Sequence, residues 1–246
     1  MRLLSALYHN AQQASMHANT HALNANTFQR ALLTAGSGLM AIMDPSRDDM
    51  ISAFGELTGK YALQNVLKQM RNDAEGAQIL RDRPIINSAT IDLVALEKLP
   101  PTTFGYQYCK FLRDNNITPD SRKPILFVDD PDLAYVILRY RQIHDFTHCL
   151  LGMKTNMLGE VTVKVFEAIQ LNLPMCWLGG LFGVLRLGPK HTEKYLSTHL
   201  DWIIENGKRS RPFINIYFEK HLERSFDDLK AECNLIDLQS FQSIKN

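Results

Sequence analysis

The sequence predicts a single all-α domain, and three features of the chain point to it. Successive runs carry apolar residues at the three- and four-residue spacing of one helix face. Proline, glycine, aspartate and asparagine stand at the ends of these runs, where helices begin and stop. No two alternating runs are joined by a turn signal, so the pattern offers no strand hairpin. We therefore expect one helical domain over residues 26–246.

The first 25 residues are left out of this domain. Asp44 is the first acidic residue of the chain, and Arg2 and Arg30 are the only lysine or arginine residues before it. An acid-free segment rich in Ala, Ser, Asn and His is typical of an organelle transit peptide, although two arginines are few for one. We expect residues 1–25 to be either such a segment or a disordered polar tail.

The N-terminal half predicts three helical runs. Residues 26–43 form the first, which Asp44 and the proline after it terminate. Residues 47–73 form the second, in which Gly59 can divide the helix. Three prolines make residues 76–103 a connector with short helix at most. A third helix then begins at a threonine cap, Thr102 or Thr103, and runs through Leu112.

The strongest helix signals lie in the middle of the chain. Asp130 followed by Pro131 is a good N-terminal cap, and Gly152 is the matching stop. A short connector leads to a second helix, which Asn156 caps and which ends before Pro174, so the two helices are expected to form a helical hairpin. The remaining chain predicts an apolar, glycine-rich run, an amphipathic helix and one or two short final helices.

Composition excludes several function classes. The formal net charge is +1 and the sequence pI is near 7.7, which gives no basic stripe for nucleic acid. The four cysteines are scattered without a CxxC pair, which argues against both a disulfide framework and a cysteine zinc site. No uncharged apolar run approaches the ~20 residues that span a bilayer. We expect a protein that is soluble or peripherally bound to a membrane.

The segment "HDFTHCLLGMKTNMLGE" carries the candidate chemistry. His144 and His148 are four residues apart, so on a helix both rings project from one face and can reach one divalent ion. Asp145 is short enough to favour direct ligation, and Glu160 supplies a carboxylate from the next helix. Two histidines with one or two carboxylates suit zinc and equally a non-haem iron site. The same four residues can also arise on a solvated helix face that binds nothing, although their apolar neighbours favour a metal.

This segment resembles the signature of the mitochondrial ubiquinone biosynthesis protein 4 family. The pattern is H-D-x-x-H, eleven residues, then E, followed by "VTVKVFEAIQLNLP". Further similar stretches are "DPSRDDMISAFGELTG", "ILRDRPIIN", "GGLFGVLRL", "WIIENGKRSRPFINIYFEKHLE" and "DDLKAECNL". The resemblance runs from about Phe28 to Leu235, with no departure at the motif positions.

The resemblance implies a largely helical protein, bound peripherally to the matrix side of the mitochondrial inner membrane within a complex of ubiquinone biosynthesis enzymes. It also implies a divalent metal, usually described as zinc, with iron or magnesium as alternatives. The ligands would be His144, Asp145, His148 and Glu160. The implied lyase activity is C1 decarboxylation of 4-hydroxy-3-methoxy-5-polyprenylbenzoate to 2-methoxy-6-polyprenylphenol, with an oxidative version also discussed.

Two further residues are candidates for catalytic roles. Lys164 lies one helical turn after Glu160 and can steady negative charge on the substrate, or can simply pair with Glu160. Arg141 lies three residues before His144 and can bind a carboxylate, although an ordinary helix arginine looks the same. Glu167 continues the face of Lys164 as a supporting or surface group.

Two regions are candidates for contact with lipid. The glycine-rich residues 175–187 are the expected wall of a polyprenyl channel, or alternatively a site of close helix packing. The basic stretch 207–211 is a weak candidate for membrane contact.

Two other functions stay open at this point. One is a non-catalytic, lipid-binding scaffold that presents quinone precursors to partner enzymes, with a purely structural metal. All four candidate ligands can bind at once, and a closed four-ligand site is typical of a structural metal. The other is a metallohydrolase of the H-E-x-x-H kind, against which the aspartate at position 145 counts.

Overall fold

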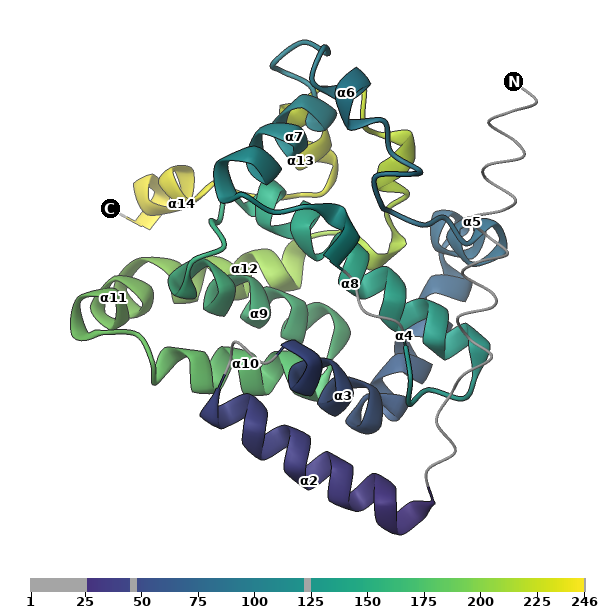
Figure 1. The fold of residues 1–246 in the computed structure, drawn as a ribbon. Helices are drawn as coiled ribbons and strands as arrows, with labels where there is room; N and C mark the ends of the chain where they lie inside the picture. The colour runs from purple at the N-terminus through teal and green to yellow at the C-terminus, as the bar shows by residue number, and fades with distance from the viewer. Residues whose placement is uncertain (1–25, 45–47, 122–124, 246) are drawn as a thin grey trace.

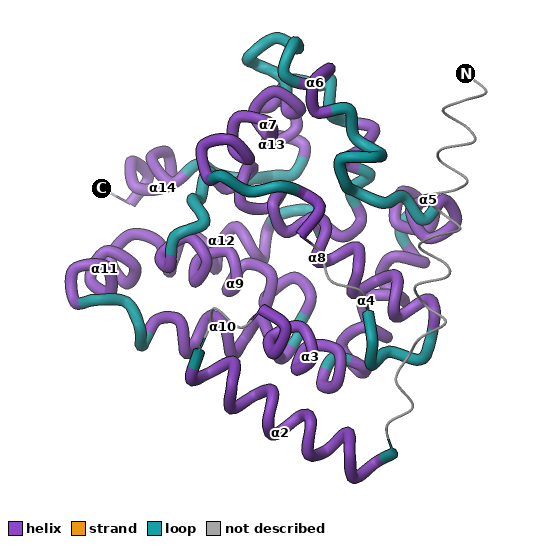
Figure 2. Tube along the Cα trace, viewed as in Figure 1, coloured by secondary structure: helices purple, strands orange, loops and turns teal. Residues whose placement is uncertain are grey.

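The computed structural model describes residues 26–44, 48–121 and 125–245, and these residues form helices and loops without a strand (Figure 2). The all-α prediction is confirmed. The prediction for residues 1–25 lies outside the described residues. The helices are α2 (Thr27–Met43), α3 (Asp48–Thr58), α4 (Lys60–Asn72), α5 (Ala74–Asp82), α6 (Leu93–Leu96), α7 (Phe104–Asn115), α8 (Pro131–Leu151), α9 (Met157–Leu171), α10 (Pro174–Val184), α11 (Pro189–Lys194), α12 (Leu200–Arg209), α13 (Phe226–Glu232) and α14 (Leu238–Lys245).

Helix α8 runs through the middle of the molecule and is buried along most of its length (Figure 1). Its ends are those that the sequence predicts. The Asp130 side chain accepts the N–H groups of Asp132 and Leu133, with Pro131 in the first turn. Gly152 ends the helix in the left-handed conformation at φ 64°, which costs glycine nothing. The central helix is thus fixed by its own caps.

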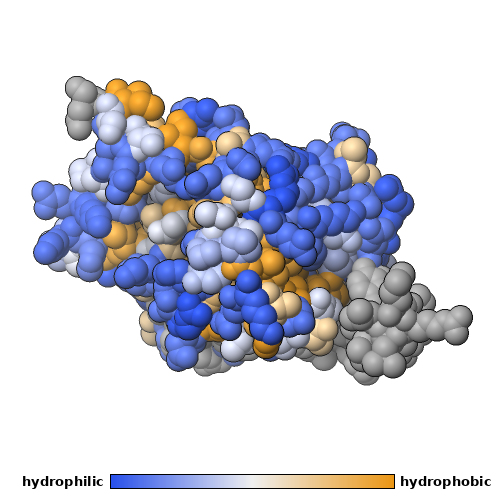
Figure 3. Space-filling model, turned by 90° about the horizontal axis from the view of Figure 1, so that it is seen from above, coloured by the Kyte–Doolittle hydropathy of each residue, from blue (hydrophilic) through white to orange (hydrophobic). Residues whose placement is uncertain are grey.

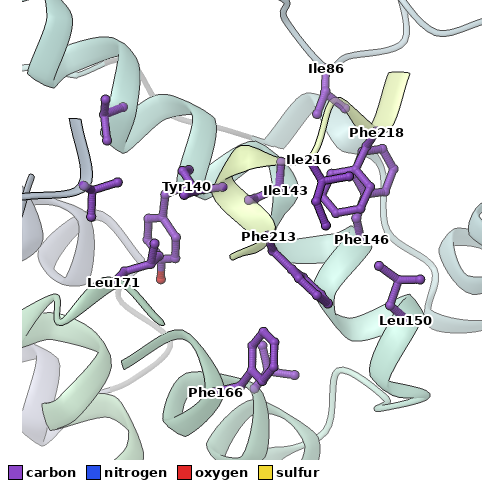
Figure 4. Close-up of a cluster of buried hydrophobic side chains, with 14 of the residues drawn as sticks. Ile86, Tyr140, Ile143, Phe146, Leu150, Phe166, Leu171, Phe213, Ile216 and Phe218 are labelled. Atoms are coloured by element: carbon purple, nitrogen blue, oxygen red, sulfur yellow. The ribbon is translucent and has the colours of Figure 1, made fainter. Parts of the chain in front are cut away.

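Aromatic side chains from the C-terminal segment pack α8 and α9 together (Figure 4). The rings of Phe146 on α8 and Phe218 lie 5.1 Å apart, and those of Phe166 on α9 and Phe213 lie 4.8 Å apart. Each ring buries a large apolar surface and adds a favourable tilted or edge contact. The two central helices therefore share one rigid core.

The turn between α8 and α9 forms the helical hairpin that the sequence predicts. Asn156 caps α9 by accepting the N–H of Gly159 at 2.9 Å, as expected from its position. A Cβ atom at Gly159 would lie 1.9 Å from the Lys154 carbonyl oxygen, so only glycine allows this tight turn. The turn therefore places the first residues of α9 beside the last turn of α8.

The connector predicted over residues 76–103 contains only short helix, namely most of α5 and the four residues of α6. The Asp73 side chain caps α5 through the N–H of Gly76, and Arg83 ends the helix in the left-handed conformation just before Pro84. The proline therefore terminates a helix here and does not prevent one. The Thr103 cap of α7 is confirmed, and Gly59 divides the second predicted run into α3 and α4.

Helices α9, α10, α3 and α2 form a second layer below α8 (Figure 1). A Cβ atom at Gly180 or Gly183 would lie 2.7 Å from Val165 and 2.4 Å from Val161, so α10 reaches α9 only through glycines. Close packing, one of the two interpretations of this glycine-rich run, is confirmed. Helix α2 in turn packs on α3, where Gly38 faces Phe54.

A buried ion pair ties α3 to α8. Arg141 donates to Glu56 at 2.8 Å and to the Ser52 carbonyl at 3.0 Å, and both charged side chains are almost inaccessible. The second oxygen of Glu56 accepts the N–H groups of Leu126 and Phe127, each at 2.7 Å. One carboxylate thus joins α3, α8 and the segment that precedes α8.

We expect Glu56→Gln to lower the free energy of unfolding by ~3–5 kcal/mol, because it leaves the buried Arg141 charge without its counter-ion. Urea denaturation measures this loss. The matched control is Lys110→Ala, which removes an exposed ion pair with Asp114 and should leave the unfolding midpoint unchanged. A loss below ~1 kcal/mol for Glu56→Gln would contradict this role.

Candidate metal centre

His144, His148 and Glu160 converge at the α8–α9 hairpin. The two histidine rings lie 4.7 Å apart and nearly perpendicular to each other. Nε2 of His144 lies 3.5 Å from one Glu160 oxygen, and Nε2 of His148 lies 3.3 Å from the other. One ligand atom from each residue falls within 4.8 Å of the others, which is close enough to surround a single ion.

The hydrogen bond at Nδ1 of each histidine ring determines that Nε2 is the nitrogen available to bind a metal. Nδ1 of His148 lies 3.1 Å from the Met153 carbonyl oxygen, and Nδ1 of His144 lies 2.6 Å from Oε1 of Glu167. Both oxygens can only accept, so each Nδ1 carries the hydrogen. In the neutral rings, Nε2 is then a bare lone pair that points at the Glu160 carboxylate.

This arrangement of donors fits a cation. Nε2 of His148 is buried and makes no hydrogen bond. Two nitrogen lone pairs and a carboxylate repel one another unless a positive charge lies among them. Two imidazoles and one carboxylate suit zinc or non-haem iron, whereas magnesium prefers oxygen ligands. Three protein ligands also leave a coordination position for another molecule.

The pKa values of the group show the same preference for positive charge. Burial alone would lower the pKa of His144, but the negative charge of Glu167 and the hydrogen bonds to Glu160 and Glu167 raise it to about 9. Burial alone would raise the pKa of Glu160, but the two adjacent histidines hold it well below its usual value. Both carboxylates therefore favour a positive charge at the histidines.

Glu167 is a supporting residue that the sequence could not distinguish from a surface group. Its side chain is buried and accepts from Tyr140 at 3.0 Å and from Lys164 at 2.9 Å, while its other oxygen faces His144. Burial would raise the pKa of Glu167, but His144 and Lys164 outweigh it and lower the pKa to about 2. The carboxylate therefore stays charged and orients the His144 ring.

The two predicted catalytic cations have different surroundings. Lys164 donates to Tyr140 at 2.9 Å and pairs with Glu167, where its sequence spacing suggested Glu160. Opposing carboxylates keep the pKa of Lys164 above its usual value in spite of burial. Arg141 turns towards α3, where Glu56 holds its guanidinium. Lys164 therefore lies beside the cluster of His144, His148 and Glu160, which we call the metal group. Arg141 is paired with Glu56 in the fold, and its catalytic role stays a prediction.

Asp145 does not belong to the group of converging ligand atoms. It is buried on α8, and its position one residue after His144 turns its side chain by about 100° around the helix axis. Its role as a fourth ligand stays a prediction.

A cavity of about 350 Å³ adjoins the group and lies between α2, α3, α9 and α10. Glu160 and Lys164 form part of its wall, and the rest of the lining is mostly apolar. Residues 175–187 contribute to it as predicted, but the contributions of α2 and α3 were missed. The other lining residues are Gly38, Ala41, Ile51, Phe54, Met157, Val161, Met175, Leu178, Gly179, Phe182, Gly183 and Arg186.

Residues 19–239 match the model of the family described as coenzyme Q (ubiquinone) biosynthesis protein Coq4. The chain is 52% identical over 207 residues to the mitochondrial ubiquinone biosynthesis protein COQ4 homolog of Drosophila willistoni, covering 84% of this chain and 78% of that protein. The Aedes aegypti homolog is 51% identical, covering 84% and 76%. The crystal structure of a putative ubiquinone biosynthesis protein from Nostoc punctiforme superposes with a TM-score of 0.66 at 18% identity, covering 81% of this chain and 95% of that one.

We expect Glu167→Gln to weaken zinc binding by about 10- to 100-fold, because the His144 ring loses the charge that orients it. Competition with a chromogenic chelator measures the affinity. Glu205→Gln, an exposed carboxylate change on α12, is the matched control and should leave affinity unchanged. A folded Glu167→Gln protein with unchanged affinity would show that His144 needs no such support.

Proposed function

Because this chain belongs to the coenzyme Q (ubiquinone) biosynthesis protein Coq4 family, we propose that it catalyses one step of that pathway, the metal-dependent removal of a carboxyl group. The substrate is 4-hydroxy-3-methoxy-5-polyprenylbenzoate and the product is 2-methoxy-6-polyprenylphenol. In the net reaction the bond between C1 and the carboxyl carbon breaks, carbon dioxide leaves and a proton takes its place. The protein is then a carbon–carbon lyase.

The observation that carries this proposal is the mostly apolar cavity whose wall contains Glu160 and Lys164. A prenylated aromatic acid has an apolar tail and a charged head, and the cavity offers a matching surface for each. The tail lies against α2, α3 and α10, and the carboxylate lies near the cation of Lys164. Cavity and metal group thus meet at the point where the substrate carries its charge.

His144, His148 and Glu160 hold the metal in this proposal, and Glu167 fixes the orientation of His144. A bound divalent cation supplies Lewis acidity, which stabilises negative charge on a substrate oxygen or on the ring. Zinc is the metal we expect, and iron fits the same donors. The three converging ligands leave a coordination position open, which supports a catalytic over a structural metal.

Lys164 acts as a fixed positive charge. Its ammonium is held by Glu167 and Tyr140, so it loses little entropy when it meets the substrate carboxylate. Its raised pKa keeps it protonated, which makes it an electrostatic group and not a base. The oxidative version of the reaction, in which hydroxyl replaces the carboxyl, additionally requires dioxygen or another oxidant.

The relatives are named mitochondrial, and within the described residues no helix is long and apolar enough to cross a membrane. We propose peripheral attachment to the matrix side of the inner membrane, in a complex with other ubiquinone biosynthesis enzymes. The support for this placement is the insolubility of a polyprenylated substrate, which resides in the bilayer.

We expect purified, zinc-loaded protein to release carbon dioxide from the prenylated acid, and His148→Ala to abolish this release together with metal binding. The loss follows because His148 supplies one of three converging ligands. Turnover of labelled acid and metal content are measured in parallel, with exposed His191→Ala as the matched control. If loaded protein makes no product while His148→Ala still assembles the complex, the lyase proposal fails and the scaffold function is favoured.

Asp145→Asn separates the three-ligand from the four-ligand site. If the three converging residues suffice, the variant binds zinc within about tenfold of the unchanged protein and keeps turnover. Metal loss comparable to that of His148→Ala would make Asp145 a ligand and would close the coordination sphere. Chelator competition provides the measurement.

A further inference from the structure

Helix α2 has its apolar face turned outward. Phe28, Leu32, Leu39 and Met43 follow one another at the spacing of a single helix face. Their exposed fractions are 76%, 64%, 59% and 68%. A surface helix normally turns such a face towards the core. Within the described part of the chain these side chains remain exposed, and an exposed apolar stripe of this kind is typical of an interaction surface.

The residues on the inward face of α2 are small or polar, which agrees with the outward position of its large apolar residues. Ser37 is buried, and the Cβ of a residue at position 38 would lie 3.0 Å from the Phe54 ring. The Thr34 hydroxyl donates a hydrogen bond to the Arg30 carbonyl oxygen at 2.7 Å. Small residues let α2 approach α3 closely, so the large apolar residues are left on the outer side.

Helix α10 presents a second outward stripe. Trp177, Leu181 and Leu185 lie four residues apart, and their exposed fractions are 46%, 62% and 74%. The helix contains no charged residue from Pro174 to Val184. A tryptophan at the edge of such a stripe is typical of residues at a membrane interface.

The two stripes border one cavity. Gly38 and Ala41 from α2, and Phe182 and Gly183 from α10, line the cavity that also contains Glu160. The uncovered apolar side chains are therefore on the two helices that enclose the proposed path of the substrate tail. In Figure 1 α2 forms the lower edge of the molecule, with α10 beside it and α6 at the opposite end. The face seen from above in Figure 3 is mainly hydrophilic, with smaller apolar patches.

The exposed charge that follows α10 is mainly positive, whereas the exposed Asp44 follows α2. Arg186, Lys190 and Lys194 follow α10 and are exposed, and Glu193 is the one acidic residue between positions 185 and 195. Helix α2 has one charged residue, Arg30, which pairs with Asp129. Apolar side chains flanked by cations complement an anionic lipid surface. The basic stretch 207–211, the weak candidate from the sequence, is less suited, because within it Arg211 is engaged by Glu75.

We propose that α2 and α10 form a docking face that lies on an anionic lipid bilayer. The outward stripes enter the boundary between headgroups and hydrocarbon, the cations contact anionic headgroups, and the cavity opens towards the lipid. The choice of a bilayer rests on the proposed function in one step, because a polyprenylated ligand partitions into lipid and must enter the cavity from there. Docking itself requires neither metal nor turnover.

Flotation with phosphatidylcholine vesicles, with and without anionic phospholipid, tests the face on the full chain without substrate. The double variants Leu32→Asp/Leu39→Asp and Leu181→Asp/Leu185→Asp should each weaken binding by at least about tenfold, since each puts two charges into the interface. The matched control is Val94→Asp on α6, where an equally exposed apolar residue at the other end should have no effect.

Lys190→Glu/Lys194→Glu separates the charge contribution from the apolar one. Compared with the unchanged protein, this variant should bind more weakly only to vesicles that contain anionic phospholipid. At high salt the two proteins should bind equally, because salt screens the charge contribution. Circular dichroism checks that each variant is folded.

Tryptophan fluorescence gives a measurement that needs no destabilising variant. The chain has two tryptophans, and Trp202 is buried at 2% exposure while Trp177 is exposed. Brominated lipids should quench Trp177 in the unchanged protein, and Trp177→Phe should remove the quenching.

Unquenched Trp177, or double variants that bind vesicles as well as the control, would overturn the proposal. Double variants that instead convert a dimer into a monomer in sedimentation analysis would make the face an interface between two copies. Binding is measured apart from turnover, so its failure leaves the proposed decarboxylase untouched. Equally, an inactive protein that still docks would refute only the enzyme.

Discussion

The contact between Glu167 and His144 is the interaction on which the arrangement of the metal group depends. The carboxylate lies 2.6 Å from Nδ1 of His144 and is itself held by Lys164 and Tyr140. The Tyr140 hydroxyl also lies 3.2 Å from the Cys176 thiol, so one buried network joins α8, α9 and α10. Because a buried carboxylate cannot remain unpaired, the network fixes the helices and the ring orientation together. The hydrogen bonds that hold these helices together therefore also orient the His144 ring.

Local signals in the sequence predict the hairpin and its donors well. The Asp130 cap, the Gly152 stop and the Asn156 cap are all short-range interactions, and all three are confirmed. The i,i+4 spacing of His144 and His148 likewise requires only that the segment is a helix. The site was therefore readable from the sequence wherever its geometry follows from bonds within a few residues.

Partners that are distant in the chain were not readable. Arg141 pairs with Glu56, which is 85 residues away in the chain, and no local sequence pattern predicts this pair. The same limit hid the contributions of α2 and α3 to the cavity, because small residues such as Gly38 have no signal of their own. The sequence of α2 shows an apolar face and a face of small residues, but only the packed structure shows which of the two is buried.

The cavity links the two proposals through its opposite walls. Glu160 on α9 takes part in the metal group, whereas Ala41 on α2 and Phe182 on α10 belong to the helices that carry the outward stripes. A ligand that spans the cavity thus has its charged head at fixed cations and its tail at an apolar surface. In the opposite orientation the apolar tail would lie against the charged side chains of Lys164 and Glu160 and would remove their hydration without a compensating contact. In the proposed reaction, the charged side chains on α9 therefore favour an orientation of the substrate with its carboxylate towards Lys164.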